Sequence, residues 1–177
     1  MLRKTPAAVF VLVLMCSAAA FQTANTWTTF DSPEGRFSIL TPSKPTVEVK
    51  EIDSAVGKLT MYAYSSDSES GYFMISFGDY PNAPTDAAQA LKVLEGVRSG
   101  VVKGLEGELT SDESVTFDGY PGREFKAKRV LENSEVIFRW KIVLVGRRLY
   151  QVAAATTPGR AESPELAKFF SSFQLKK

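Results

Sequence analysis

The chain lacks histidine altogether and has only one cysteine among its 177 residues. Without an imidazole it cannot assemble a Ser-His-Asp triad, a Cys-His dyad, or a zinc or haem site with histidine ligands. The single thiol, Cys16, lies in an N-terminal segment that we expect to be cleaved off, so the mature protein would also lack thiol nucleophiles, disulfides and thiolate metal ligands. These two absences exclude several common classes of enzyme.

The chain also has no strong excess of charge and no familiar catalytic motif. Its 21 Lys and Arg residues and 20 Asp and Glu residues give a formal net charge of +1, so we predict no nucleic-acid partner. Neither a G-x-S-x-G elbow, a Walker A loop, a Ser-x-x-Lys pair nor a G-x-G-x-x-G turn occurs in the sequence. The acidic residues lack the spacing of an EF-hand loop, so we predict no metal site and no cofactor.

Residues 1–20 have the three parts of a secretory signal peptide. Arg3 and Lys4 precede an apolar run over 7–15, and an A-x-A exit follows at Ala18 and Ala20. The apolar run is shorter than the roughly 20 residues that a transmembrane helix needs. We therefore predict an exported protein, periplasmic or extracellular, without a transmembrane span.

Cys16 raises a second route of processing, in which a bacterial lipoprotein is cut just before a cysteine that then carries lipid. Such signals have a small residue before the cysteine, whereas this chain has the bulky Met15 there. We therefore prefer simple cleavage to a lipid anchor at Cys16. A flexible tail over 21–26 and one folded domain over 27–177 would follow.

The pattern of the expected domain is mostly that of β-strands. Alternating or continuous apolar residues predict strands at 36–40, 46–52, 58–64, 72–77, 108–117, 123–131, 135–145 and 149–156, with a polar loop over 65–71. Asn133-Ser134 and Gly146-Arg147 suit two-residue hairpin turns. We expect an antiparallel sheet of about six to seven strands.

Two segments have helical periodicity. One opens at Pro84 and Thr85 and carries an apolar stripe as far as Leu105, and the other has Ser163 as N-cap and Pro164 in its first turn. Glycines at 96, 100 and 104 either let the first helix pack close to the sheet or form a groove that faces a partner. The combination predicts an α+β domain, and we favour helices on both faces of the sheet.

A cluster of cations is the clearest candidate for a binding site. If Asn133 and Ser134 form the loop, Lys128 lies opposite Arg139 and Lys126 opposite Lys141, all on the face away from Trp140. Like charges across a ladder destabilise a sheet, so acids nearby or an anionic partner should compensate them. The four cations Lys126, Lys128, Arg139 and Lys141 are therefore either neutralised locally or form a face that binds an anion or a partner.

Four short segments, at 30–39, 119–124, 148–152 and 169–175, contain turn and packing motifs. These segments resemble those of small exported bacterial proteins of the PsbP-like superfamily. The resemblance implies an α/β/α sandwich around an antiparallel sheet, and a binding or assembly factor without a catalytic centre. The calcium role of PsbP depends partly on histidine, which this chain lacks, so the resemblance supplies no site residue.

Together these observations predict an exported, non-enzymatic accessory or interaction protein of the bacterial cell envelope, whose partner is another envelope protein. The first alternative is a carrier of a small hydrophobic or anionic ligand, lined by Tyr62, Tyr64 and the face from Lys126 to Lys141. The second is a hydrolase with paired carboxylates, because the 20 acidic residues allow many pairs that only geometry can select.

Overall fold

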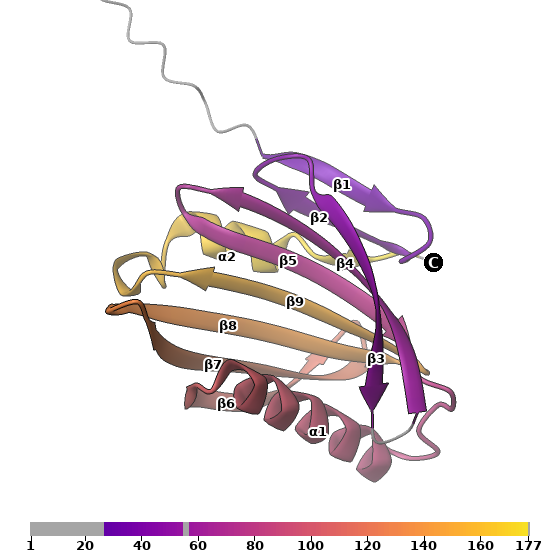
Figure 1. Ribbon diagram of the computed structural model, residues 1–177. Coiled ribbons are helices and arrows are strands. Elements are labelled where there is room, and N and C mark those ends of the chain that lie inside the picture. The colour runs from indigo at the N-terminus through magenta and orange to yellow at the C-terminus, as the bar shows by residue number, and fades with distance from the viewer. Residues whose placement is uncertain (1–26, 55–56, 177) are drawn as a thin grey trace, which may run out of the picture.

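The computed structural model describes residues 27–54 and 57–176, which form two antiparallel sheets and two α-helices (Figure 1). The larger sheet has seven strands in the order β3-β4-β5-β9-β8-β7-β6. Their bounds are β3 (Thr46–Ser54), β4 (Gly57–Ser68), β5 (Gly71–Asp79), β6 (Glu108–Phe117), β7 (Tyr120–Leu131), β8 (Ser134–Val145) and β9 (Arg148–Thr156). The predicted signal peptide (1–20), its Cys16 and the tail over 21–26 lie outside the described residues.

A second sheet of three strands was not predicted. It consists of β1 (Thr28–Ser32), β2 (Phe37–Thr41) and β10 (Gln174–Leu175), with β2 in the centre. The strand expected at 36–40 therefore exists, but it does not belong to the large sheet. In Figure 1 the β1–β2 hairpin lies beside the C-terminal end of the chain, and Leu175 pairs with Phe37. Pairing partners 138 residues apart in the chain leave no local signal in the sequence.

The two helices contact different side chains of the large sheet. Helix α2 (Pro164–Ser171) packs in a cluster that contains Phe37 of β2 and Val143 of β8. Helix α1 (Ala87–Leu105) packs in a cluster that contains Ile142 of β8. A 3₁₀ turn, η1 (Pro158–Arg160), precedes α2. Each fully buried aromatic or aliphatic side chain in these clusters contributes roughly 1.5–3 kcal/mol to folding.

Helix α1 begins at Ala87, three residues after the predicted opening at Pro84. Asp86 is its N-cap, and the Asp86 carboxylate accepts a hydrogen bond from the Gln89 backbone N–H at 2.8 Å. Pro84 and Thr85 precede this cap and are not helical. The helix ends where Glu106 adopts a left-handed φ of 50°. The start of α2 is as predicted, with Ser163 as N-cap and Pro164 in the first turn.

The glycines at 96, 100 and 104 do not pack against the sheet. A Cβ atom built on any of them meets no neighbouring atom within 4 Å, and all three residues are exposed. The interpretation of close packing is therefore wrong. The glycines leave a smooth strip on the outer side of α1, where the helix backbone is open to solvent.

The segment over 65–71, predicted to be a polar loop, is mostly strand. Residues 65–68 continue β4 and pair with 71–74 of β5, which leaves a tight turn at Glu69 and Ser70. Gly71 has a φ of 139°, which favours glycine at the end of such a turn. The Thr156 hydroxyl of β9 donates a hydrogen bond to the Ser70 carbonyl at 2.8 Å, which holds this turn against the neighbouring strand.

The β7–β8 hairpin has a register two residues away from the predicted one. Its turn is Glu132-Asn133, with φ values of 48° and 68°. These values match a type I′ turn, which needs positive φ at both central residues. Lys126 therefore faces Arg139, and Lys141 faces Glu124, so the expected pairs Lys128–Arg139 and Lys126–Lys141 are wrong. A shift of two residues keeps each side chain on its face of the sheet.

The β8–β9 hairpin matches its prediction. Trp140 faces Ala153 and Phe138 faces Ala155, so small side chains on β9 leave room for large ones on β8. Gly146, with a φ of 58°, forms the turn with the residue that follows it. Because glycine readily adopts positive φ, Gly146 identifies the first central residue of this turn, whereas the β7–β8 turn contains no glycine.

Candidate functional site

The predicted basic face lies on one side of β7 and β8, as expected from strand alternation. Side chains point alternately to opposite faces along a strand, so Arg139 and Lys141 lie on the face away from Trp140, and Lys126, opposite Arg139, shares their face. Among the four cations, Lys126 and Arg139 are directly opposed across the β7–β8 ladder, whereas Lys128 and Lys141 face residues that are not cations.

Glu124 neutralises two of the four cations. Its carboxylate oxygens lie 3.0 Å from Lys141 Nζ and 3.2 Å from an Arg139 guanidinium nitrogen. Burial alone would raise the pKa of Glu124, but the hydrogen bonds and charges of Lys141 and Arg139 lower it below its ordinary value. The guanidinium also lies 4.4 Å from the ring centre of Phe170 on α2. Glu124 is thus an ionised centre of the cluster.

The other two cations are paired at the edges of the same face. Lys126 Nζ lies 2.6 Å from a Glu162 carboxylate oxygen, and Lys128 Nζ lies 3.2 Å from that of Glu108. All four cations therefore have an acidic partner within 3.2 Å. This pairing favours local neutralisation over an open site for an anion.

A small polar cavity of about 150 Å³ opens beside this cluster. Glu113, which faces Glu124 across β6 and β7, lines it together with Glu162, Lys126 and Arg139. Two directly opposed carboxylates are the arrangement that a carboxylate-dependent hydrolase would need. One of them, Glu124, is however held ionised by two cations.

A second charged cluster escaped the sequence analysis. Arg148 of β9 binds Asp79 of β5 with two hydrogen bonds, of 2.7 and 2.9 Å, and lies 4.7 Å from the ring centre of Phe77. The hydrogen bond from Arg148 is the largest cause that lowers the pKa of Asp79. Arg148 also donates to the Glu34 carbonyl at 2.8 Å, so it joins the large sheet to the β1–β2 turn. This cluster is structural.

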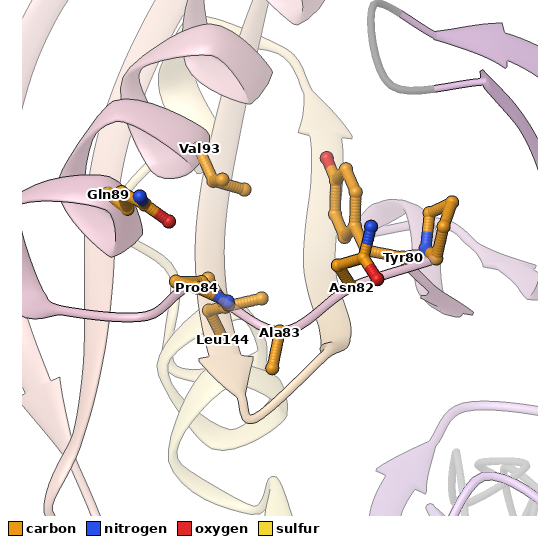
Figure 2. Close-up of a pocket in the computed structure, with 8 residues that line it drawn as sticks. Tyr80, Asn82, Ala83, Pro84, Gln89, Val93 and Leu144 are labelled. Carbon is orange, nitrogen blue, oxygen red and sulfur yellow. The ribbon is translucent and has the colours of Figure 1, made fainter.

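A mainly apolar cavity of about 170 Å³ lies between the end of β5 and helix α1. Figure 2 shows Tyr80 on one side of this space and Val93 of α1 on another, with Ala83 and Pro84 in the connecting segment between them. Burial raises the pKa of the Tyr80 phenol above its ordinary value. Asn82 and Gln89 supply the amide groups of the lining.

An open groove of about 400 Å³ adjoins this cavity, since Pro84 and Leu144 line both. We call it the α1 groove. Its lining comes from the start of α1, the β6–β7 turn and the end of β8: Pro84, Asp86, Ala87, Ala90, Thr116, Gly119, Tyr120, Pro121, Leu144 and Gly146. Tyr120 is among the large apolar side chains that are exposed. The groove is thus a mainly apolar surface open to solvent.

The structure separates the residues that were expected to line a ligand carrier. Tyr62 stacks on Phe77, with ring centres 4.9 Å apart and planes 8° apart, and Tyr64 lies 4.9 Å from Phe30. Both tyrosines are partly buried against the core beneath the small sheet. Strands β5 and β9 lie between β4, which carries the tyrosines, and β8, which carries Arg139.

The described residues contain neither a metal-binding group of side chains nor a membrane-spanning helix. Within 27–54 and 57–176, no group of three or more His, Cys, Asp or Glu side chains is arranged to hold a metal ion. In the same part of the chain, no helix combines the length and apolar character needed to cross a bilayer.

No protein-family model matches the sequence, and no curated protein is significantly similar to it. Solved structures are similar in fold. The solution structure of cyanobacterial PsbP (CyanoP) from Synechocystis sp. PCC 6803 has a TM-score of 0.54 at 11% identity, covering 90% of this chain and 98% of that one.

Two further structures are similar at lower scores. A protein from Bacteroides thetaiotaomicron has a TM-score of 0.49 at 17% identity over 84% of this chain, and this chain spans only 48% of its length. A protein of unknown function from Pseudomonas aeruginosa has a TM-score of 0.39 at 12% identity, covering 80% of this chain and 90% of that one. On the similarity to cyanobacterial PsbP, the chain has a PsbP-like fold.

Proposed function

We propose that this chain is an exported, non-enzymatic accessory protein of the bacterial cell envelope that binds another envelope protein through the α1 groove. The observation that carries the proposal is the groove itself, an open hollow of about 400 Å³ with a mainly apolar lining. Exposed apolar patches with polar rims are typical of protein-binding surfaces. Asp86 and Thr116 supply polar groups among the lining residues.

The basic face is a weaker candidate for the binding surface. An anionic partner would have to displace the acids that already bind its cations, and Glu124 holds two of them at once. Replacing one carboxylate by another gains little free energy, because the desolvation of the cluster is already compensated. The α1 groove has no such competitor.

The carrier is the runner-up, and it is disfavoured because the more enclosed cavity is small and the larger hollows are open to solvent. Pockets for small ligands usually measure about 300–1,000 Å³ and enclose most of the ligand. The cavity between Tyr80 and Val93 measures about 170 Å³, and the larger α1 groove is open. A long apolar chain of a partner fits an open groove better than a free small molecule does.

The carboxylate hydrolase is also disfavoured. Such an enzyme needs one carboxyl group that stays protonated near neutral pH while the other is ionised. Neighbouring cations lower the pKa values of Glu124 and Glu162 below their ordinary value, so these two cavity acids are poorly suited to donate a proton near neutral pH.

We also infer that the two helices cover opposite faces of the large sheet, as the α/β/α sandwich requires. Consecutive residues of β8 support this inference: Ile142 belongs to the cluster with α1 and Val143 to the cluster with α2. Neighbouring side chains on a strand point to opposite faces. The small sheet adds a further layer on the α2 side, since Phe37 belongs to that cluster.

Export is supported by the sequence of residues 1–20 alone. Mass spectrometry of the protein purified from its native host tests it, with a mature N-terminus at Phe21 as the expected result. An intact N-terminus would contradict export by this signal. A lipid mass on Cys16 would replace simple cleavage by anchoring.

Affinity capture from the native envelope tests the binding surface. We expect Tyr120→Ser, at an exposed residue of the groove lining, to lose the captured protein that the wild type retains. Val130→Ser is the matched control, because Val130 is exposed but lies in the β7–β8 hairpin, outside the groove. Equal capture by the groove variant and the control would overturn the proposal.

A further inference from the structure

The two edges of the large sheet differ in how they resist pairing with another strand. At one edge, β6 has a register shift between Leu109 and Ser111, and its acids Glu108, Asp112 and Glu113 give it one sign of charge. At the other edge, β3 pairs with β4 without a shift from Thr46 to Ser54. Bulges and charged side chains are common protections of sheet edges. β3 has no register shift in its pairing with β4, and its charges are of both signs, so a second strand with matching charges could pair with it.

The exposed side chains of β3 are unusual for an edge strand. Val47 and Val49 are 60% and 54% exposed, and Ile52 is also among the large apolar side chains that are exposed. Val47 and Val49 lie on one face of the strand, and Glu48 and Lys50 alternate with them and lie on the other face. Glu48 and Lys50 form an ion pair of 2.8 Å within the strand.

The order of these charges selects one way for β3 to pair with itself. In an antiparallel pair with its two-fold axis at Val49, residue numbers across the ladder add to 98, so Glu48 faces Lys50 of the second copy and Lys50 faces Glu48. An axis at Glu48 would oppose two glutamates, and an axis at Lys50 would oppose two lysines. Like charges directly opposite destabilise a ladder, whereas opposite charges stabilise it. Only the axis at Val49 is favourable among these three.

The axis at Val49 also pairs the charges on one face and two valines on the other. On one face, the Glu48 and Lys50 side chains of both copies form a closed ring of four alternating charges. On the other face, the two Val49 side chains meet directly, whereas each Val47 faces Glu51 of the other copy. The apolar contact is therefore centred on the two Val49 side chains.

We propose that two copies of this chain associate through antiparallel pairing of their β3 strands, centred on Val49, so that two seven-stranded sheets become one continuous sheet. The proposal goes beyond the proposed function, because the α1 groove contains no residue of β3. Both copies would keep their grooves, so the dimer would present two binding surfaces. Two linked sites raise the apparent affinity for a partner that is itself repeated.

Charge reversal tests this pairing, with analytical ultracentrifugation of the purified protein as the measurement. In the dimer, Glu48→Lys would turn the ring of alternating charges into four lysines, and Lys50→Glu would turn it into four glutamates. We expect each variant to raise the dissociation constant of the dimer on the order of tenfold or more. Because Glu48 and Lys50 are both more than 60% exposed, the fold of each copy should remain intact.

The double variant Glu48→Lys with Lys50→Glu should restore the dimer, since it regenerates the alternating ring with the signs exchanged. Glu106→Lys, on an exposed residue beside the end of α1, is the control and should leave the dimer unchanged. A wild type that stays monomeric at 100-micromolar concentration, about the range where a weak dimer forms, would overturn the proposal. A double variant that fails to restore the dimer would overturn it as well, and neither result bears on the α1 groove.

Discussion

Lys141 and Glu124 face each other across the β7–β8 ladder and form an ion pair of 3.0 Å, with only 14% and 19% of their side chains exposed. A mostly buried carboxylate that loses its cation retains the desolvation penalty without the compensating charge. The Lys141–Glu124 pair therefore gives the basic face a role in the stability of the fold.

Lys141→Ser should lower the free energy of unfolding by about 1–3 kcal/mol, because it leaves Glu124 with Arg139 alone. Urea unfolding measures the change. Lys128→Ser is the control and should cost less than about 0.5 kcal/mol, since Lys128 and its partner Glu108 are much more exposed. Equal costs for the two variants would contradict this role of Glu124.

Gly100→Ala and Gly96→Ala should each stabilise the protein by about 0.5–1 kcal/mol. Both glycines lie inside α1, and a Cβ atom at either position meets no atom within 4 Å. Thermal or urea unfolding gives the change. Gly35→Ala is the opposite control, because its Cβ would lie 2.4 Å from the buried ring of Phe37, and it should destabilise the fold. Destabilisation by Gly100→Ala would show that the glycine strip is packed against something.

Asp79→Asn should flatten the dependence of stability on acid pH. The folded-state pKa of Asp79 is lowered by its hydrogen bonds with Arg148, so the stability it contributes is present above its ordinary pKa and is lost as pH falls through the lowered one. In the wild type this loss falls between about pH 5 and pH 2. Unfolding measured across this range should show a smaller decline in the variant, and parallel profiles would argue against the assignment.

Local patterns predicted most strands of the large sheet and both helices. Ser163 and Pro164 define the start of α2 by capping chemistry that depends on adjacent residues alone, and Gly146 identifies its hairpin turn in the same way. The position of the β7–β8 turn was harder to predict, because Glu132 and Asn133 both adopt positive φ although glutamate seldom does. A single misplaced turn moved every cross-strand pair of that hairpin by two residues.

The small sheet and the ion pairs depend on contacts between distant parts of the chain. Leu175 reaches Phe37, and Arg148 reaches Asp79, over separations that no periodicity records. The sequence therefore identified the cations of the basic face but not which acids neutralise them. The α1 groove could not be predicted from the sequence either, because its lining residues come from the start of a helix and from two turns. The adjacent residues Tyr120 and Pro121 are the one local signal that could have suggested it.

The affinity for the captured envelope protein, once purified, tests most directly the claim that binding occurs at the α1 groove and not at the basic face. By calorimetry, the groove variant Tyr120→Ser should bind at least about tenfold more weakly than the wild type. The variant with Lys126→Ser and Lys128→Ser, whose cations are paired with the exposed acids Glu162 and Glu108, should bind as the wild type does. Full affinity in the groove variant together with lost affinity in the lysine variant would contradict the account.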